Sequence, residues 1–242
     1  MTDAPDREGH RQRLREKFLR HGLDKFTDEE IVELLLTLAT PRRDCKQSAR
    51  EVLGKFKTLR NVLEAELADL TQVKGVGPAN AFGIKFIHQI TRKFLRERMM
   101  GRPYLNNSEE VLDYLDHAMR GLKHEVFRVI YLSSAHEIVD EEGIAAGTAT
   151  EVPVTPRQIV ERAVKSGAAA IVLAHNHPGG EPLPSDEDRA LTRETGFTAA
   201  VMGVRLLEHL IIAPGGHFSF AAEGILGDYE AEYNRVTARL FR

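Results

Sequence analysis

Apolar residues in the first hundred positions recur with the period of an α-helix. The segment 29–39 begins after Thr27, and Glu30 stands three residues later, so the two can form a capping box at a helix start; Pro41 then ends the helix. The face of this helix is apolar at Ile31, Leu34, Leu35 and Leu38. Further helices are predicted over about 44–56 and 59–64 and on both sides of a glycine turn near residue 76. We expect residues 1–100 to form an all-helical domain.

The pattern changes to alternation of apolar and polar residues beyond position 124, which indicates strands. Residues 99–107 contain Gly, Pro and two Asn, and we place a domain boundary there. Thr155 and Gln158 form a capping box, with Pro156 at the first helical position and Gly167 after the end. The expected strands are 125–132, 137–141, 144–148, 168–174, 205–212 and 218–220, and the expected helices are 108–121, 156–166, 186–202 and a C-terminal tail, 228–242.

Strands separated by helices in this way predict a mixed sheet with helices packed on it. The fold class is therefore α+β. Its parts are a helical domain over residues 1–100, a mixed-sheet domain over residues 105–227 and a helical tail over residues 228–242.

The composition narrows the class of protein. The chain has 242 residues, of which 42% are hydrophobic, and this is enough for one large or two modest domains. Cys45 is its single cysteine, which excludes a disulfide framework and a cysteine-based zinc site. The first ten residues are polar, and no apolar run reaches the roughly 18 residues that span a membrane. We expect a soluble cytoplasmic protein with no membrane partner.

Charge is distributed unevenly along the chain. The formal net charge is −3, but residues 1–100 hold 20 Lys and Arg against 15 Asp and Glu, a net of +5, which leaves −8 for the remainder. Such asymmetry indicates two domains with different partners, and a basic half can face a polyanion. A net of +5 over 100 residues is mild, however, and solvated basic helix faces are common.

The sequence His175-Asn176-His177, followed by Asp188, has the residue types and spacing of a metal site. Residues 168–174 are apolar and predict a buried strand, in which side chains two apart leave on one face about 6.6 Å apart. Two His and one Asp leave the fourth tetrahedral position open, as in catalytic zinc sites. Ser185 and Asp188 are also spaced as an ordinary helix capping box. The two histidines favour the metal, and we expect one Zn²⁺ per chain.

The arrangement His-x-His-Pro, six residues and then Ser-x-x-Asp resembles the JAMM motif of MPN-domain metalloproteases. The segment HNHPGGEPLPSDED is similar to its version in the bacterial RadC proteins, which are labelled DNA repair proteins, and the likeness covers most of residues 105–227. Two departures lie outside the ligands: the family usually has Ser where this chain has Gly179 or Gly180, and often His or Tyr in place of Thr155. They concern the shape of the groove. The resemblance implies a JAMM-type zinc hydrolase with an MPN fold, most simply a peptidase or isopeptidase acting on a protein or peptide.

Hydrolysis of an amide requires a carboxylate that takes a proton from the metal-bound water. Spacing alone leaves the candidates Glu125, Glu137, Glu141, Glu142 and Glu151 open. The resemblance to the JAMM pattern implies Glu125 as this base and Ser185 as a donor to the oxyanion. The pair Glu208-His209 resembles the Asp-His pair of RadC, and we place it behind the ligands rather than among them.

The segment from Leu70 to Ile84 resembles a helix-hairpin-helix motif. Gly75 and Gly77 would form the turn, glycines let a backbone approach a phosphate, and Lys74 supplies a cation. These three residues are the candidate DNA contacts, and such contacts bind DNA without reading its sequence. The alternative is that the turn only connects two helices.

Three functions of different classes follow: a zinc-dependent peptidase or isopeptidase, a DNA-processing enzyme, and a DNA-associated module without catalysis. Intact ligands argue against the third. The contiguous His-Asn-His does not have the spread arrangement of an HNH nuclease, and the His-x-Glu with Pro-Cys-x-x-Cys of zinc deaminases does not occur in the sequence. The sequence does not separate the first two functions, nor does it fix the substrate or the oligomeric state.

Overall fold

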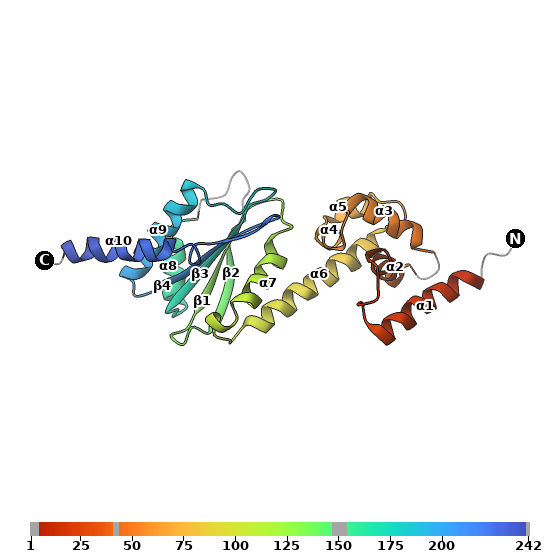
Figure 1. The fold of residues 1–242 in the computed structure, drawn as a ribbon, viewed down its shortest axis with the longest axis horizontal. Coiled ribbons are helices and arrows are strands. Elements are labelled where there is room, and N and C mark those ends of the chain that lie inside the picture. Colours follow the sequence, from red (N-terminus) through yellow and green to blue (C-terminus); the bar gives the residue numbers. More distant parts are fainter. Residues whose placement is uncertain (1–4, 41–43, 147–153, 241–242) are drawn as a thin grey trace. The chain divides into compact units, whose positions relative to one another are not determined.

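The computed structural model describes residues 5–40, 44–146 and 154–240 (Figure 1). The chain divides into two compact units, residues 1–91 and 92–242. The division between Thr91 and Arg92 falls inside one helix. The Gly- and Pro-containing segment at 99–107, where the sequence pattern places a boundary, follows the end of that helix. The exact domain limits therefore remain a prediction.

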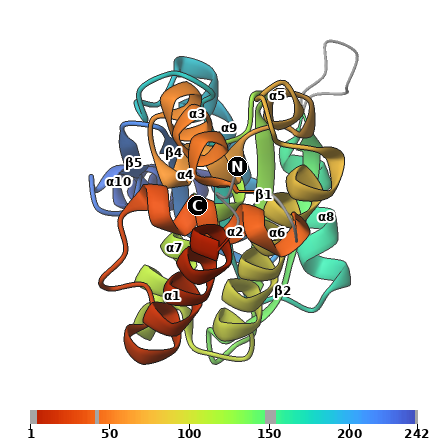
Figure 2. The ribbon, with the colours of Figure 1, turned by 90° about the vertical axis from the view of Figure 1, so that its right-hand side faces the viewer.

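The first unit is helical, as the sequence predicts. Val32, Ala49 and Leu70 are fully buried in its core, and α3 packs against α2 and α4 (Figures 1 and 2). The Thr27–Glu30 capping box is present at the start of α2. The helices are α1 Pro5–His21, α2 Asp28–Ala39, α3 Lys46–Phe56, α4 Leu59–Glu64, α5 Leu67–Thr71 and α6 Pro78–Met99, which continues into the second unit.

The turn between α5 and α6 is tied to neighbouring helices. Gly75 has φ +85°, and a Cβ atom built there would lie 2.1 Å from the Ser48 Oγ of α3. The Gly77 N–H donates to Asn80 Oδ1 at 3.1 Å. The Asn80 side-chain amide in turn donates to the Leu36 carbonyl and to Thr40 Oγ1, each at 2.9 Å. Close packing therefore requires glycine at position 75, whereas Gly77 takes part through its backbone N–H.

The second unit contains a five-stranded mixed sheet in the order β2-β1-β3-β4-β5. β1 is antiparallel to β2 and β3, β3 is parallel to β4, and β5 returns antiparallel to β4. The strands are β1 Val126–Leu132, β2 Ile138–Ala146, β3 Ala170–Asn176, β4 Arg205–Ala213 and β5 Gly216–Ser219. The helices are α7 Ser108–Met119, α8 Pro156–Lys165, α9 Asp186–Val201 and α10 Ile225–Leu240, with a 3₁₀ turn, η1, over Tyr104–Asn106.

Several boundaries differ from the sequence prediction, most by one or two residues, and three of them change the picture. The two strands expected at 137–141 and 144–148 are one strand, β2, which continues through Gly143 because that residue pairs with Arg128; residues 147 and 148 lie outside the described part. β3 extends two residues further, because His175 and Asn176 still pair with β4. The final helix begins at Ile225 rather than at 228.

Apolar residues cover both faces of the sheet. On one face Ile130 and Val172 pack with Val111 and Leu115 of α7. On the other face Val129 and Leu173 pack with Ile159 of α8 and Ala199 of α9. Strand β3 is buried along its whole length, which explains its continuous apolar run.

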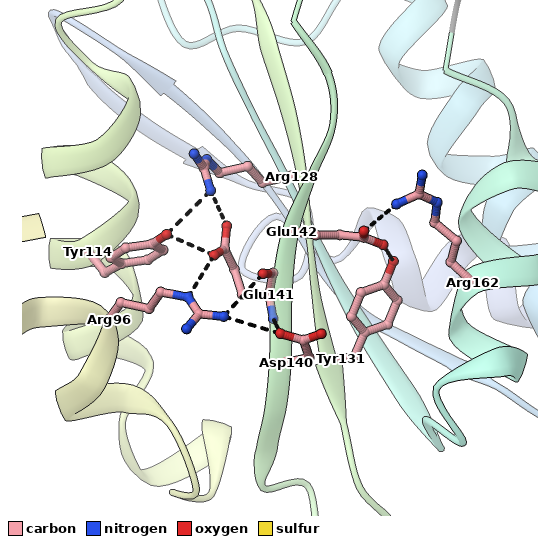
Figure 3. A network of polar contacts seen from close by, with 8 residues as sticks. All are labelled: Arg96, Tyr114, Arg128, Tyr131, Asp140, Glu141, Glu142 and Arg162. Atoms are coloured by element: carbon pink, nitrogen blue, oxygen red, sulfur yellow. Dashed lines mark hydrogen bonds and ion pairs between the residues drawn. The ribbon is translucent and has the colours of Figure 1, made fainter. Parts of the chain in front are cut away.

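Two adjacent glutamates of β2 point to opposite faces and anchor helices there (Figure 3). Glu141 is buried, pairs with Arg128 and with Arg96 of α6, and accepts a hydrogen bond at 2.9 Å from the Tyr114 hydroxyl. Burial raises the pKa of Tyr114 to about 12, so that phenol remains a donor. Glu142 instead pairs with Arg162 of α8 and accepts from the Tyr131 hydroxyl.

The packing of Gly75 gives a test of the helical unit. Gly75→Ala should lower the free energy of unfolding by about 2–4 kcal/mol, since the positive φ costs about 1 kcal/mol and forced overpacking a further 1–3. Gly22→Ala is the matched control, because Gly22 also has positive φ but nothing within 4 Å of its Cβ position, so only the first cost applies. Urea unfolding followed by circular dichroism measures both.

A second variant locates the cause of the loss. Adding Ser48→Ala to Gly75→Ala removes the Oγ atom that meets the new methyl group, and part of the stability should return. Equal losses for Gly75→Ala and Gly22→Ala would contradict close packing of the turn on α3.

Candidate metal centre

Nitrogen and oxygen atoms of His175, His177 and Asp188 converge on one point. His175 Nε2 lies 3.0 Å from His177 Nε2 and 3.1 Å from Asp188 Oδ1, and His177 Nε2 lies 3.4 Å from Asp188 Oδ2. Zinc bonds of about 2.0–2.1 Å in a tetrahedron separate neighbouring ligand atoms by about 3.3 Å. The contacts of His175 with His177 and with Asp188 Oδ1 are close to this value, and His177 approaches the other oxygen of the same carboxylate. The three side chains, which sequence spacing predicted as ligands, thus form a group that could hold a metal ion.

Strand β3 and the turn after it position the two histidines. His175 is the sixth residue of the strand and pairs with Phe127 of β1, while the His177 N–H continues the ladder by donating to the Ile212 carbonyl at 2.9 Å. Residues two apart in extended chain face the same side. His177 Nδ1 lies 3.1 Å from the Glu181 carbonyl; because that oxygen only accepts, Nδ1 carries a hydrogen and Nε2 is the nitrogen left for a metal.

Asp188 is both a helix cap and a candidate ligand, the two alternatives that the sequence left side by side. Its Oδ2 accepts from the Ser185 N–H at 2.8 Å and the Ser185 hydroxyl at 2.7 Å, completing the capping box of α9. Its Oδ1 faces His175. Burial opposes ionisation of Asp188 and raises its pKa, whereas the two hydrogen bonds from Ser185 lower the pKa and favour the carboxylate. The carboxylate is ionised, as a metal ligand must be.

Two further residues, Thr192 and His209, extend this group into the interior. His209 Nε2 lies 2.9 Å from His175 Nδ1, and His209 Nδ1 lies 2.6 Å from Thr192 Oγ1. Both residues are fully buried. Burial lowers the pKa of His209 well below its usual value, so its imidazole is neutral. The sequence analysis predicted that His209 lies behind the ligands. It did not identify Thr192, although Thr192 lies one helical turn after Asp188 and therefore on the same side of α9.

Glu208 has a different task from its neighbour. One carboxylate oxygen accepts the N–H groups of His209 and Ala221, and the other accepts the Ser219 hydroxyl at 2.6 Å. Burial raises the pKa of Glu208, and these hydrogen bonds oppose the rise. Glu208 thus fastens the turn after β5 to β4.

Glu125 lies just before β1 and is exposed. Side chains two apart point the same way, so Glu125 shares a face with Phe127, whose ring stacks on His175 with centroids 6.0 Å apart. The buried Asn176 holds the backbone on both sides of Glu125: its side chain accepts from the Val126 N–H at 2.8 Å and donates to the His124 carbonyl at 3.1 Å. The pairing of β1 with β3 ends at Phe127 opposite His175, two residues after Glu125 and two before His177.

The other glutamates considered for the base lie elsewhere or are engaged. Glu141 points to the opposite face of the sheet and is held by two arginines. Glu142 pairs with Val129 in the sheet, and its carboxylate is engaged by Arg162 and by the Tyr131 hydroxyl. Glu137 is exposed at the start of β2, beyond Leu132 at the far end of β1, and Glu151 lies outside the described residues.

The candidate DNA contacts lie in the turn before α6. Lys74 and Gly75 are exposed and Gly77 is half-buried, with its N–H already bonded to Asn80. A phosphate at this turn would therefore meet Lys74 rather than the Gly77 amide. Contact with DNA stays a prediction.

A cavity of about 400 Å³ lies between α9, the start of β4 and α10, away from the converging ligand atoms. Its walls include Gly196, Phe197, Leu226 and Tyr233. It shares one residue, Thr192, with the group of polar side chains behind the metal centre. The ligand atoms, not this cavity, identify the reactive position.

Comparison with known proteins agrees with this geometry. Residues 105–225 match the model of a family described as RadC-like JAB domain, and residues 8–82 match one described as UPF0758 N-terminal. A UPF0758 protein of Rhodobacter capsulatus is 40% identical, over 88% of this chain and its own full length. UPF0758 proteins of Fusobacterium nucleatum and Ruegeria pomeroyi are 36% and 38% identical, over 91% and 90% of this chain and 98% and 97% of their own. No described helix is long and apolar enough to cross a membrane.

The convergence predicts that purified protein binds about one zinc ion per chain, and that His177→Ala loses most of it, because one of three ligand atoms is removed. His217→Ala is the control, since His217 is an exposed histidine on β5. Elemental analysis after dialysis measures both. Zinc content that is the same in wild type and His177→Ala would contradict the assignment.

Proposed function

The chain belongs to the RadC-like JAB domain family, and from that membership together with the geometry we propose that it is a zinc-dependent hydrolase that cleaves peptide or isopeptide bonds. The observation that supports the proposal is the convergence of the two imidazole nitrogens, 3.0 Å apart, on the Asp188 carboxylate, with one ligand atom of each residue within 4.8 Å of the others. Nitrogen and carboxylate donors suit zinc, and three protein ligands leave a fourth position for water.

The chemistry divides among the residues around this position. A zinc ion held by His175, His177 and Asp188 would lower the pKa of a bound water and would polarise a carbonyl oxygen. Glu125, on the same face and anchored by Asn176 on both sides, takes the proton of that water and returns it to the leaving nitrogen. Its exposure keeps it accessible to substrate.

Ser185 serves as a donor to the oxyanion. Its hydroxyl lies beside a ligand residue, 2.7 Å from Asp188 Oδ2, and is exposed. With substrate bound, the hydroxyl turns from Asp188 to the oxygen of the attacked carbonyl, while the Ser185 N–H continues to hold the carboxylate at 2.8 Å. Donors placed in this way stabilise the charge that develops in acyl transfer.

The turn before α6 carries a second proposal, weak contact with DNA as in a helix-hairpin-helix. It is supported by the exposed Lys74 and by the net charge of +5 in residues 1–100. Such contact could bring a protein substrate bound to DNA to the hydrolase, or it could belong to a DNA-processing enzyme. The two differ in which bond is cut.

Glu125→Gln should keep zinc and lose activity. The amide has the size of the carboxylate but cannot accept a proton, so turnover should fall by about 10²–10⁴-fold. The assay incubates zinc-loaded protein with a library of proteome-derived peptides and isopeptide-linked conjugates, and detects new amino termini by mass spectrometry. Wild type should create them, whereas Glu125→Gln and His177→Ala should not.

Glu137→Gln is the matched control, because Glu137 is an exposed glutamate at the far end of the same strand pair. A parallel incubation with single- and double-stranded DNA tests the competing chemistry. Full activity of Glu125→Gln would show that this residue is not the base. Breaks in the DNA strands together with intact peptides would show that the protein cuts DNA instead of peptide bonds.

The full chain should bind DNA weakly, and its affinity should fall with salt with a log–log slope near −3, as about three or four phosphates release counterions. Lys74→Gln should reduce the slope by about 1. Fluorescence anisotropy of labelled duplexes measures both, and Lys165→Gln, an exposed lysine of α8, is the control. An unchanged slope in Lys74→Gln would indicate that the turn only connects two helices and does not contact DNA.

A further inference from the structure

Behind the ligand atoms, a chain of four hydrogen-bonding groups runs from α9 through β4 to β3. Thr192 Oγ1 donates to the Asp188 carbonyl at 2.5 Å and lies 2.6 Å from His209 Nδ1. The other nitrogen of His209 lies 2.9 Å from His175 Nδ1. The backbone of one ligand residue is thus connected to the ring of another through two residues that touch no metal position.

The hydrogen atoms in this chain have one consistent direction. A carbonyl oxygen only accepts, so the single hydroxyl hydrogen of Thr192 is committed to Asp188. His209 Nδ1 must then donate to Thr192. His209 is fully buried, and among the described residues its ring nitrogens contact only Thr192 and His175 and no carboxylate, so a charged ring would be an unpaired buried charge. In the uncharged ring Nε2 has a lone pair and accepts from His175 Nδ1. His175 therefore carries its hydrogen on Nδ1, and its Nε2 lone pair faces Asp188 Oδ1 and His177 Nε2.

We infer that Thr192 and His209 are positioning residues that hold His175 in the only neutral form able to bind zinc through Nε2. The inference rests on the proposed function, because it concerns the same metal. It assigns a role to two buried polar residues for which packing alone gives no reason. Groups behind a metal ligand set its tautomer and ring orientation in this way.

Packing and strand geometry hold the chain in place. The His209 ring stacks on Phe220 with centroids 4.9 Å apart and meets the edge of Phe127, which itself stacks on His175. Strand β4 has a bulge where its register against β3 shifts, between Ile171 and Val172. Beyond this bulge His209 pairs with Leu173, so the His209 ring lies on the face of the sheet that also bears His175.

Thr195 shows what the same residue type does without this role. It lies on α9 three residues after Thr192 and is equally buried, but its Oγ1 has no hydrogen-bond partner among the described residues. A buried hydroxyl without a partner costs free energy, whereas that of Thr192 bonds to two groups. The pair provides a matched comparison within one helix.

Thr192→Val keeps the shape of the side chain and removes the hydroxyl. His209 Nδ1 then has no acceptor, so His209 can move its hydrogen to Nε2 and donate to His175 Nδ1. His175 in turn must carry its hydrogen on Nε2, where zinc has to bind. Zinc affinity should fall by about 10–100-fold, the usual effect of losing such a partner. Thr192→Ser retains the hydroxyl and should restore most of the affinity, and Thr195→Val should leave it unchanged.

The experiment has two measurements on the full chain. Competition with a chromophoric chelator gives the zinc affinity of wild type and the three variants. Long-range ¹H–¹⁵N spectra of the metal-free protein show which nitrogen of His209 carries hydrogen: Nδ1 in wild type, Thr192→Ser and Thr195→Val, and Nε2 in Thr192→Val. A purely structural role of Thr192 would not exchange the tautomer.

Several results would overturn the inference. They are a wild-type His209 with its hydrogen on Nε2, a Thr192→Val protein with wild-type zinc affinity, or an equal loss in Thr195→Val. The first needs no variant and so remains decisive if Thr192→Val fails to fold. A wild-type protein that binds no zinc, with His209 in the expected tautomer, would count against the proposed function instead.

Discussion

The candidate metal centre depends on the alternation of side chains between the two faces of an extended strand. At the end of β3, side chains alternate between the two sheet faces, so His175 and His177 emerge together while Asn176 points away and bonds to the segment before β1. One three-residue stretch therefore supplies two candidate ligands and fastens the backbone of the candidate base. A shift of register by one residue would turn all three side chains to the wrong face.

The elements whose signals are local were predictable from the sequence. The apolar run before His175, the capping boxes of α2, α8 and α9, and the helix after Pro156 each depend on residues close in the chain, and each is present. His175, His177 and Asp188 were predictable for the same reason, because they lie close together in the sequence, at the end of one strand and the start of the next helix. Family resemblance added Glu125, which its own neighbours identify only as a polar residue at a strand start.

What the sequence could not provide depends on pairing between distant segments. The bulge in β4 fixes which face His209 occupies, and no pattern in Arg205–Ala213 indicates it. Thr192 resembles any threonine inside a helix until His209, 17 residues later, is placed beside it. Likewise, Gly75 and Gly77 resemble a phosphate-binding turn, yet Ser48 of α3 occupies the space beside Gly75, and the Gly77 N–H is already bonded to Asn80.

The double use of Asp188 has a kinetic consequence. Its Oδ2 is held by the first residue of the capping box and its Oδ1 faces His175, while His177 is held through its other nitrogen by Glu181. Fraying of the first turn of α9, a local opening, would break the bonds between Ser185 and Asp188 and move Asp188 Oδ1 away from His175. The exchange of an ion bound there would therefore be coupled to the opening of this turn.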